Sequence, residues 1–355
     1  MVAETDNADF LELISNKFDI KGSEEEIKKL TELLQQIYQT TEGKDLLESL
    51  SGNPKIALSH GMLEGANGEH ANHSIKMANW SSTTLFHELL HERQEQENVR
   101  SGNALSPEDA YLTNIMQEME VRINSECFVL KDYLQNDPEK LKAYQDDNES
   151  DIGFLYQNFL KLKEKNPNLS DDELLNLAKS ALSERYLEQI KETQKEIDEI
   201  KKEHPEYSAK DIEKQIMENE SMSKSEKGHK QTIIGWFVDY QDQFEGAKKG
   251  ISINQTKDGK EIFDYYKERL NLNTEYEDVF KNMFDKNAQI QQVDETTKNI
   301  LIDGKIVGRI CETEQGREIC VYEENSTEIK SKRIETANSI QIFDKDNNLI
   351  SEKKI

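Results

Sequence analysis

The sequence predicts an α+β protein, and three patterns along its 355 residues lead to this expectation. Two short alternating segments in the N-terminal part, 55–59 and 73–80, are typical of strands, and amphipathic helical patterns surround them. The middle of the chain is helical in pattern and heavily charged, and the C-terminal part carries hairpin signals. We therefore expect a mixed domain at 1–145 with a helix packed on a small sheet, a charged helical region at 146–290, and an antiparallel β meander at 291–355.

The composition is strongly acidic. The chain has 45 Lys and Arg residues against 71 Asp and Glu residues, which gives a net charge of −26. Proteins dedicated to nucleic acid neutralise phosphates with patches of Lys and Arg, so this balance argues against a nucleic-acid partner. The sequence has no run of about 18 apolar residues, which predicts that no segment spans a membrane.

The expected compartment is the cytoplasm. The N-terminal segment from Met1 to Asp6 is acidic and lacks the basic-then-apolar layout of a secretory signal. The 3 Cys residues are too few for a disulfide scaffold. Export by a route without a cleaved signal stays open, and the sequence does not indicate an oligomeric state.

Capping signals place the helices of the N-terminal domain. Ser23-Glu24-Glu25-Glu26 is a capping box, and apolar residues recur behind it at helical spacing. Either residue of Ser81-Ser82 should cap a helix that runs to about Asn98. Ser106-Pro107 is followed by two acids, which is typical of a helix start, and this helix should run to about Leu134.

The chemically informative motif is His87-Glu88-Leu89-Leu90-His91, which has the form H-E-x-x-H. Residues four apart lie on one face of a helix, so both imidazoles can reach one metal ion. Neutral imidazole suits Zn²⁺, and Glu88 at the flank of that face could take a proton from water that the metal polarises. A chain of this composition would contain the pattern by chance about 0.02 times.

This stretch resembles the active-site helix of zincin metallopeptidases. Residues 41–94 are similar, more narrowly, to a bacterial family of zincin-like metallopeptidases with a short Gly-containing helix, two strands and a His-Glu-x-x-His helix that ends near Arg-Gln. In this chain those elements are Gly43-Lys44-Asp45-Leu46-Leu47, Ile56-Ala57-Leu58, Ser74-Ile75-Lys76-Met77 and Thr83–Gln94. Many zincins carry uncharged residues after the second His, whereas Glu92 and Arg93 follow it here. The resemblance implies Zn²⁺ as the cofactor and a protein or peptide as the substrate.

The third metal ligand is expected on the helix that follows the motif. Catalytic zinc keeps three protein ligands and one open position. Families similar to this one use a Glu with a small residue three positions later, and Glu118 with Val121 fits that pattern. The helical wheel places Glu118 away from the centre of the apolar stripe, however, and Glu120 and Glu126 closer to it. Glu118 is the first choice, and Glu120 and Glu126 remain alternatives.

A peptidase also needs a donor for the developing oxyanion. The residues of suitable type are Tyr111, Arg122, His229 and Tyr240, and the sequence does not rank them. The segment 232–240 is the most apolar part of the middle region, and we expect it to pack in a core. Three further histidines precede the motif, namely His60, His70 and His73. Because 61–72 contains three glycines and little periodicity, we expect a loop there and solvated histidines.

The C-terminal part has two hairpin signals. Asp303-Gly304 lies between two apolar runs and predicts a two-residue turn. A second two-residue turn at Gln315-Gly316 would place Cys311 directly opposite Cys320. The pair could form a disulfide in an oxidising space, and in a cytoplasm we expect two thiols.

Two functions of different classes follow from these patterns. The first is a zinc-dependent peptidase in which Glu88 is the general base and His87, His91 and Glu118 bind the metal. The alternative is a metal-binding scaffold without turnover that carries a protein-interaction module in its helical and β parts, including the case of an effector that acts in another cell. The sequence does not reveal the substrate or the cleavage preference.

Overall fold

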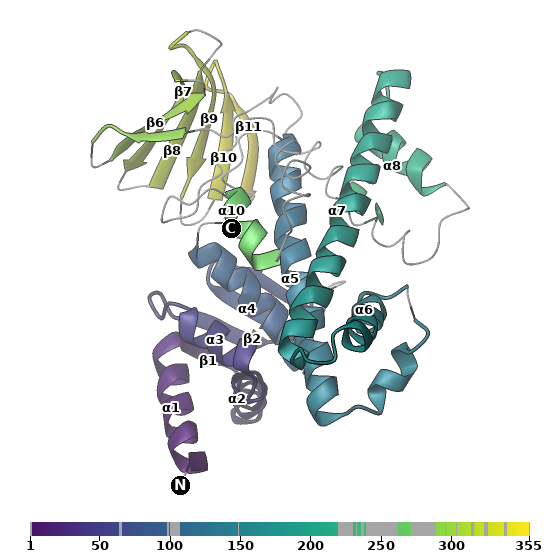
Figure 1. Ribbon diagram of the computed structural model, residues 1–355. Coiled ribbons are helices and arrows are strands. Elements are labelled where there is room, and N and C mark those ends of the chain that lie inside the picture. The colour runs from purple at the N-terminus through teal and green to yellow at the C-terminus, as the bar shows by residue number, and fades with distance from the viewer. Residues whose placement is uncertain are drawn as a thin grey trace. The chain divides into compact units, whose positions relative to one another are not determined.

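The computed structural model confirms the α+β class (Figure 1). It describes residues 2–63, 66–97, 99, 107–147, 149–218, 230–231, 233–235, 238, 262–270, 289–294, 296–302, 304–313, 316–322, 326–336 and 339–354. The chain forms two compact units. The first contains Met1–Val99, Gln117–Ser183 and Glu268–Asn271, and the second contains Arg100–Met116, Glu184–Lys267 and Leu272–Ile355. The domain boundaries expected from the sequence stay predictions.

A four-stranded sheet organises the first unit. Its strands are β1 (Phe18–Lys21), β2 (Ile56–His60), β3 (Gly68–Ala71) and β4 (Ser74–Met77), in the order β1-β2-β4-β3. The pairs β1–β2 and β2–β4 are parallel, and β3 runs antiparallel to β4 at one edge. The expected strands correspond to β2 and β4. The expectation of a loop over 61–72 was wrong for Gly68–Ala71, because Asn72 and His73 adopt positive φ angles of 49° and 57° and turn the chain into the β3–β4 hairpin.

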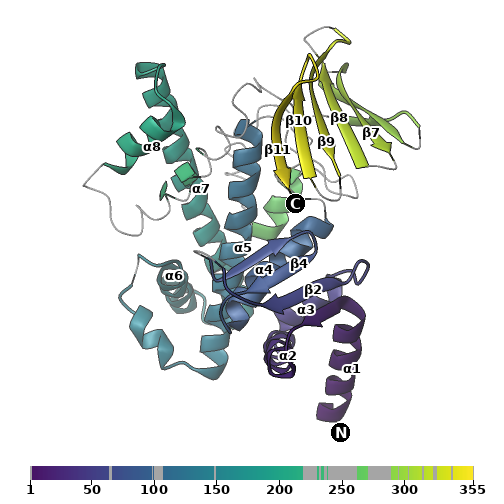
Figure 2. The same cartoon turned by 180° about the vertical axis from the view of Figure 1, so that it is seen from behind.

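Four helices belong to the N-terminal part of this unit, namely α1 (Val2–Lys17), α2 (Glu24–Tyr38), α3 (Thr41–Ser49) and α4 (Ser82–Gln96). The predicted capping box is confirmed, because Ser23 and Glu26 cap α2 reciprocally. Ser81 caps α4 by accepting a hydrogen bond from the backbone N–H of Thr84. Helices α2 and α4 pack against the sheet and against each other (Figure 2).

The apolar core of the first unit lies between these helices and the sheet. Strands β2 and β4 contribute Ile56, Leu58, Ile75 and Met77, all fully buried. Helix α4 contributes four residues to the same cluster, namely Leu85, Phe86, Leu89 and Leu90. Because these four residues face inward, the packing fixes the rotation of α4 about its axis, and with it the direction of the polar residues between them.

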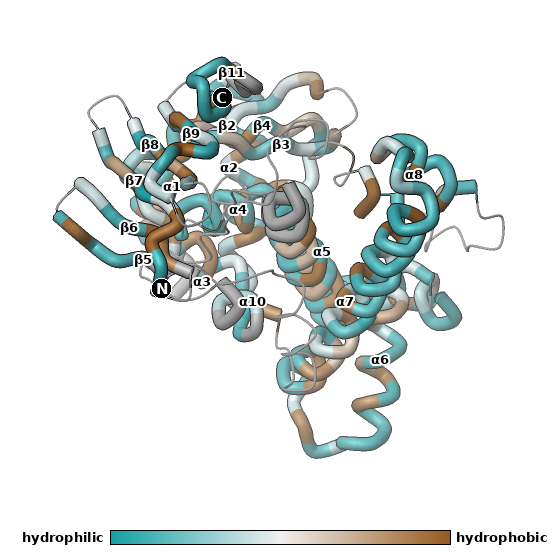
Figure 3. The backbone as a smooth tube through the Cα atoms, turned by 90° about the horizontal axis from the view of Figure 1, so that it is seen from above, coloured by the Kyte–Doolittle hydropathy of each residue, from teal (hydrophilic) through white to brown (hydrophobic). Residues whose placement is uncertain are grey.

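Long helices continue beyond the sheet domain. Helix α5 (Pro107–Asn136) begins at the predicted residue and ends within two residues of the predicted end. It is followed by the 3₁₀ helix η2 (Lys140–Tyr144), α6 (Asp151–Lys165), α7 (Asp171–Glu203) and α8 (Ala209–Met217). Hydrophilic residues predominate along α7 and α8, as expected for the charged middle region (Figure 3). None of the described helices is both long and apolar enough to cross a membrane.

The second unit contains the predicted antiparallel meander. Its seven described strands follow the order β11-β10-β9-β8-β7-β6-β5, and every neighbouring pair is antiparallel. They are β5 (Gln289–Gln292), β6 (Thr297–Ile302), β7 (Lys305–Thr313), β8 (Gly316–Tyr322), β9 (Ile329–Glu335), β10 (Ser339–Asp344) and β11 (Leu349–Lys354). Helix α10 (Ile262–Leu270) is shared between the two units, because residues from Glu268 onward belong to the first. The predicted turn at Asp303-Gly304 is confirmed, because Ile302 pairs with Lys305.

The predicted register of the next hairpin was wrong by one residue. Thr313 pairs with Gly316, so Gly316 belongs to the strand pairing and is not a turn residue. Cys311 consequently pairs with Glu318, and Cys320 pairs with Arg309. The two cysteines are diagonal neighbours, about 7–8 Å apart in such a pair, which is beyond the distance for a disulfide. Both are free thiols in the structure.

Gly43 allows α3 to approach the end of α2. A Cβ atom on this residue would lie 2.1 Å from the carbonyl oxygen of Ile37. Helix propensity alone would make Gly43→Ala stabilising by about 1 kcal/mol. We expect the opposite, a loss of about 2–3 kcal/mol in the free energy of unfolding, because the backbone must shift. Denaturant unfolding measures it, with the exposed Asp45→Ala in the same helix as the control. A stabilised Gly43→Ala protein would contradict this packing.

Candidate metal centre

Helix α4 positions the two motif histidines on one side of the core. His87 and His91 are one turn apart, and their ring centroids lie 5.0 Å apart at an interplanar angle of 75°. The intervening Leu89 and Leu90 are buried in the cluster described above. The apolar packing of α4 therefore turns both imidazoles toward the same neighbouring segment, which is the part of α5 that belongs to the first unit.

Glu118 on α5 meets both imidazoles. Its Oε1 lies 3.1 Å from Nε2 of His91, and its Oε2 lies 3.8 Å from Nε2 of His87. The three side chains offer ligand atoms that all lie within 4.8 Å of one another. Tetrahedral zinc with bonds of about 2.0–2.1 Å separates its ligand atoms by about 3.3 Å. Two imidazole nitrogens and one carboxylate at these separations fit a zinc ion. The structure brings Glu118, the first choice for the third ligand, together with the two histidines, and its role as a ligand stays a prediction.

The charges of these groups are coupled. Burial alone would lower the pKa of His91 and raise that of Glu118, but the hydrogen bond between them raises the pKa of His91 and lowers that of Glu118 to about 2. Burial lowers the pKa of His87 to about 4, and His91 contributes to this shift. The carboxylate of Glu118 therefore stays ionised, and His87 stays neutral, as a metal ligand must be.

Glu88 lies beside this group, and its carboxylate is largely buried. Burial raises its pKa to about 7, and the charge of His91 opposes that rise. Gly68 of β3 leaves the space for this carboxylate, because a Cβ atom there would lie 2.7 Å from Oε1 of Glu88. A larger residue at position 68 would displace the Glu88 side chain. Sequence reasoning missed Gly68, since the segment around it was expected to be a loop.

A buried hydrogen-bond chain holds His91 from behind. The side chain of Gln94 lies 3.0 Å from Nδ1 of His91 through its Oε1, and its Nε2 donates to the carbonyl oxygen of Gln117 at 3.0 Å and to Oε2 of Glu120 at 2.5 Å. Because the amide nitrogen donates to two oxygens, Oε1 is left to accept a hydrogen bond from the Nδ1–H of His91. This fixes the His91 tautomer with Nε2 as the atom that faces Glu118.

The alternative ligands lie elsewhere. Glu120 is fully buried, and besides Gln94 it accepts a hydrogen bond from Nη2 of Arg93 at 2.7 Å. Glu126 lies two turns further along α5 and interacts electrostatically with Asp151. Among the described residues, neither of the two belongs to the group that brings His87, His91 and Glu118 together.

Of the four candidates for the oxyanion donor, Arg122 is the one whose side chain the structure describes. Nε of Arg122 lies 4.0 Å from Oε2 of Glu118, so its guanidinium borders the metal group. The side chain of Tyr111, and all of His229 and Tyr240, lie outside the described residues. The described members of the apolar segment 232–240 include Ile233, Ile234 and Val238, and all three are buried, as a core role requires.

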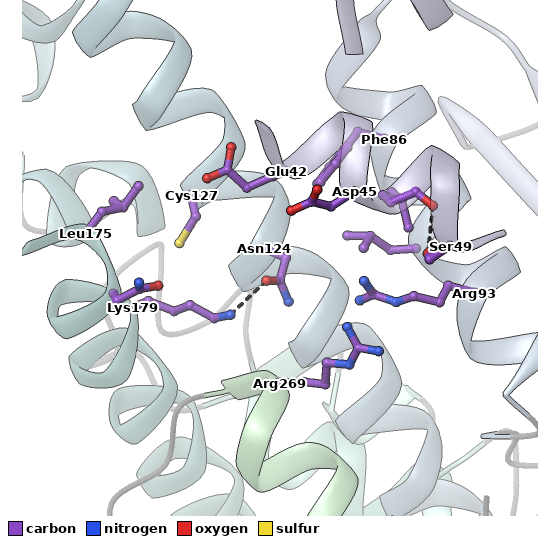
Figure 4. Close-up of a pocket in the computed structure, with 13 residues that line it drawn as sticks. Glu42, Asp45, Ser49, Phe86, Arg93, Asn124, Cys127, Leu175, Lys179 and Arg269 are labelled. Carbon is purple, nitrogen blue, oxygen red and sulfur yellow. Dashed lines mark hydrogen bonds between the residues drawn. The ribbon is translucent and has the colours of Figure 1, made fainter. Parts of the chain in front are cut away.

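A cavity of about 420 Å³ lies on another side of α4 within the first unit (Figure 4). Arg93, Lys179 and Arg269 contribute cationic groups to its lining, and Nζ of Lys179 donates a hydrogen bond to Oδ1 of Asn124 at 2.9 Å. Burial lowers the pKa of Lys179. None of the three candidate metal ligands lines this cavity, so the cavity and the metal centre are separate features.

Comparisons of this chain with protein-family models, with curated proteins and with solved structures found no match. What the structure supports is a His- and Glu-containing group with metal-ligand geometry. Kinship with the zincin-like metallopeptidases stays an expectation from the sequence.

Glu126 gives the first unit a pH-dependent stability. Burial raises its pKa to about 7 from an ordinary value of 4.5, Asp151 adds to the rise and Arg122 opposes it. Its contribution to stability is complete below the unfolded pKa and is lost as pH rises through the folded pKa, by about 3 kcal/mol in all. We expect Glu126→Gln to remove this loss, so the variant should exceed the wild type at about pH 8 but not at about pH 5.

Denaturant unfolding at the two pH values measures the difference between Glu126→Gln and the wild type. The exposed Glu164→Gln is the control, because its side chain is not desolvated. If Glu126→Gln and the wild type differ by the same amount at both pH values, the carboxyl of Glu126 does not titrate as described.

Proposed function

We propose that this protein is a zinc-dependent peptidase. The observation that carries the proposal is the meeting of three donor atoms from His87, His91 and Glu118 with the carboxylate of Glu88 beside them. His87, His91 and Glu118 would hold the ion. When bound, zinc would supply Lewis-acid polarisation of the scissile carbonyl and of the attacking water.

The protein residues supply the rest of the chemistry. Glu88 accepts a proton from the attacking water and returns it to the departing amine, which is the work of a general base and then a general acid. Its buried position beside Gly68 confines the carboxylate. Arg122 places a guanidinium next to Glu118 and is the described residue best located to stabilise the oxyanion.

The sheet offers a way to position an extended peptide. Strand β3 is an edge strand that pairs with β4 alone among the described strands, and its Gly68 lies against Glu88. A peptide that adds to a free strand edge is held by main-chain hydrogen bonds and becomes aligned along the strand. Pairing with β3 would carry the peptide past the carboxylate of Glu88. The substrate class that this geometry favours is an unfolded or extended segment of protein.

The central test separates metal binding from catalysis. We expect Glu88→Gln to retain the zinc content of the wild type and to lower kcat/KM for peptide cleavage by about 10²–10⁴-fold, because only the proton acceptor is lost. Glu118→Gln should hold one zinc fewer per chain than the wild type, whereas Glu126→Gln, two turns further along α5, should not. Metal analysis by mass spectrometry and a diverse peptide library provide the two measurements.

Each outcome of this test has a distinct meaning. Equal zinc in the wild type, Glu118→Gln and a His91→Ala variant would refute the ligand set. Zinc that depends on Glu118 without cleavage of any peptide would reject the peptidase and leave the metal-binding scaffold as the function. Undiminished cleavage by Glu88→Gln would remove Glu88 from the chemistry.

Gln94 should act as a positioning residue for His91. Replacing it with Leu removes the acceptor for Nδ1, so we expect zinc affinity to fall by about 10–100-fold. Arg93→Met is the matched control, because Arg93 donates to the same Glu120 and, two residues after His91 on α4, points to another side of the helix. Competition with a chromophoric chelator measures the affinity. If Arg93→Met weakens zinc binding as much as Gln94→Leu, the effect comes from the Glu120 network as a whole.

A further inference from the structure

A second group of metal-ligating side chains lies next to the first, and the peptidase chemistry does not use it. It consists of His70 on β3 with Glu92 and Glu95 on α4. Nε2 of His70 lies 2.7 Å from Oε2 of Glu92 and 3.4 Å from Oε2 of Glu95. The ligand atoms of the three residues all lie within 4.8 Å of one another.

The side chains of this group are largely buried. The side chain of Glu92 is 0% exposed, that of His70 is 8% exposed and that of Glu95 is 10% exposed. Two desolvated carboxylates therefore face one imidazole nitrogen, which carries at most one proton. A buried carboxylate needs a cation or several hydrogen bonds to offset its lost hydration.

Neighbouring residues hold Glu92 in place through its Oε1 atom. Nδ1 of His73 lies 2.8 Å from Oε1 of Glu92, and Nε2 of Gln96 donates to the same oxygen at 2.6 Å. Both contacts are made to Oε1, which leaves Oε2 directed at His70 beside Glu95. His73 also approaches Glu95, with its Nε2 4.0 Å from Oε1. The supporting contacts therefore orient the carboxylate as the outer contacts of a metal ligand do.

We propose that His70, Glu92 and Glu95 form a second binding site for a divalent transition-metal ion such as zinc. One imidazole nitrogen with two carboxylate oxygens is a donor set that Zn²⁺ accepts, and separations of 2.7 and 3.4 Å bracket the spacing of about 3.3 Å between ligands of a tetrahedral ion. The proposal does not rest on peptide hydrolysis at the first site.

The second site joins the two elements that frame the first. His70 belongs to β3, which carries Gly68, and Glu92 directly follows His91 on α4. The His70 and His91 rings stack with centroids 6.4 Å apart and an interplanar angle of 20°. A cation there would tie the edge strand to the helix beside Glu88, so its role is to fix β3 against α4.

Zinc stoichiometry tests the second site on the full chain. Protein is stripped with a chelator and titrated with Zn²⁺ by calorimetry, and bound zinc is then counted by mass spectrometry. The wild type should bind two zinc ions, and His70→Asn and Glu95→Gln should each bind one. His87→Ala, which alters the first site and changes no residue of the second, should also bind one, and the double variant His70→Asn/His87→Ala should bind none.

His60→Asn is the matched control, because His60 lies in the same sheet but stacks on Trp80 and pairs with Glu26. It should bind two zinc ions. Circular dichroism establishes that each variant is folded, and Glu95→Gln provides a second probe if His70→Asn unfolds.

The outcomes separate this inference from the proposed function. A wild type that binds one zinc, lost in His87→Ala and retained in His70→Asn and Glu95→Gln, overturns the second site and leaves the first intact. A single zinc that is lost in His70→Asn and Glu95→Gln but retained in His87→Ala supports the second site and contradicts the first. No bound zinc in the wild type overturns both.

Discussion

The burial of one face of α4 is the constraint on which the candidate centre depends. Phe86 stacks on Phe128 of α5 with ring centroids 4.3 Å apart and an interplanar angle of 13°, and Leu85 and Leu89 are fully buried. Successive residues of a helix are rotated by about 100° about its axis. Because these apolar side chains face inward, the directions of the polar side chains between them are determined as well. The same contact brings α5 alongside α4, so the packing that orients the histidines also delivers Glu118.

The charged residues after the second histidine, which depart from the usual zincin pattern, are explained by the same rotation. Glu92 turns toward β3 and meets His70 and His73, whereas Arg93 turns toward α5 and meets Glu120. Gln94 joins His91 to that second contact. Each of these buried polar side chains has a hydrogen-bond or ion-pair partner, so the helix can carry charged residues inside the fold.

The sequence predicted what local rules determine. The spacing of His87 and His91, the Ser23 capping box and the Asp303-Gly304 turn are each decided within a few residues, and the structure agrees with all three. Contacts made between distant segments were harder to predict. A helical wheel for α5 shows which residues share a face but not which neighbour that face meets, so it could not choose among Glu118, Glu120 and Glu126. The predicted pairing of Cys311 with Cys320 was wrong because a register displaced by one residue changes every cross-strand pair.

Strand β3 was missed for a related reason, and its role shows how much of the site lies outside the motif. Its four residues have no apolar alternation, because Gly68 is selected by its small size beside Glu88 and His70 by its contact with Glu92. The available signal was Asn72-His73, a pair in which Asn tolerates positive φ and which closes a hairpin onto β4. A short polar strand at a sheet edge gains little from burial, so it must be held by specific contacts. Those contacts come from α4, which carries Glu88 and contributes His87 and His91 to one group of candidate metal ligands and Glu92 and Glu95 to the other. The apolar core determines the position of this helix.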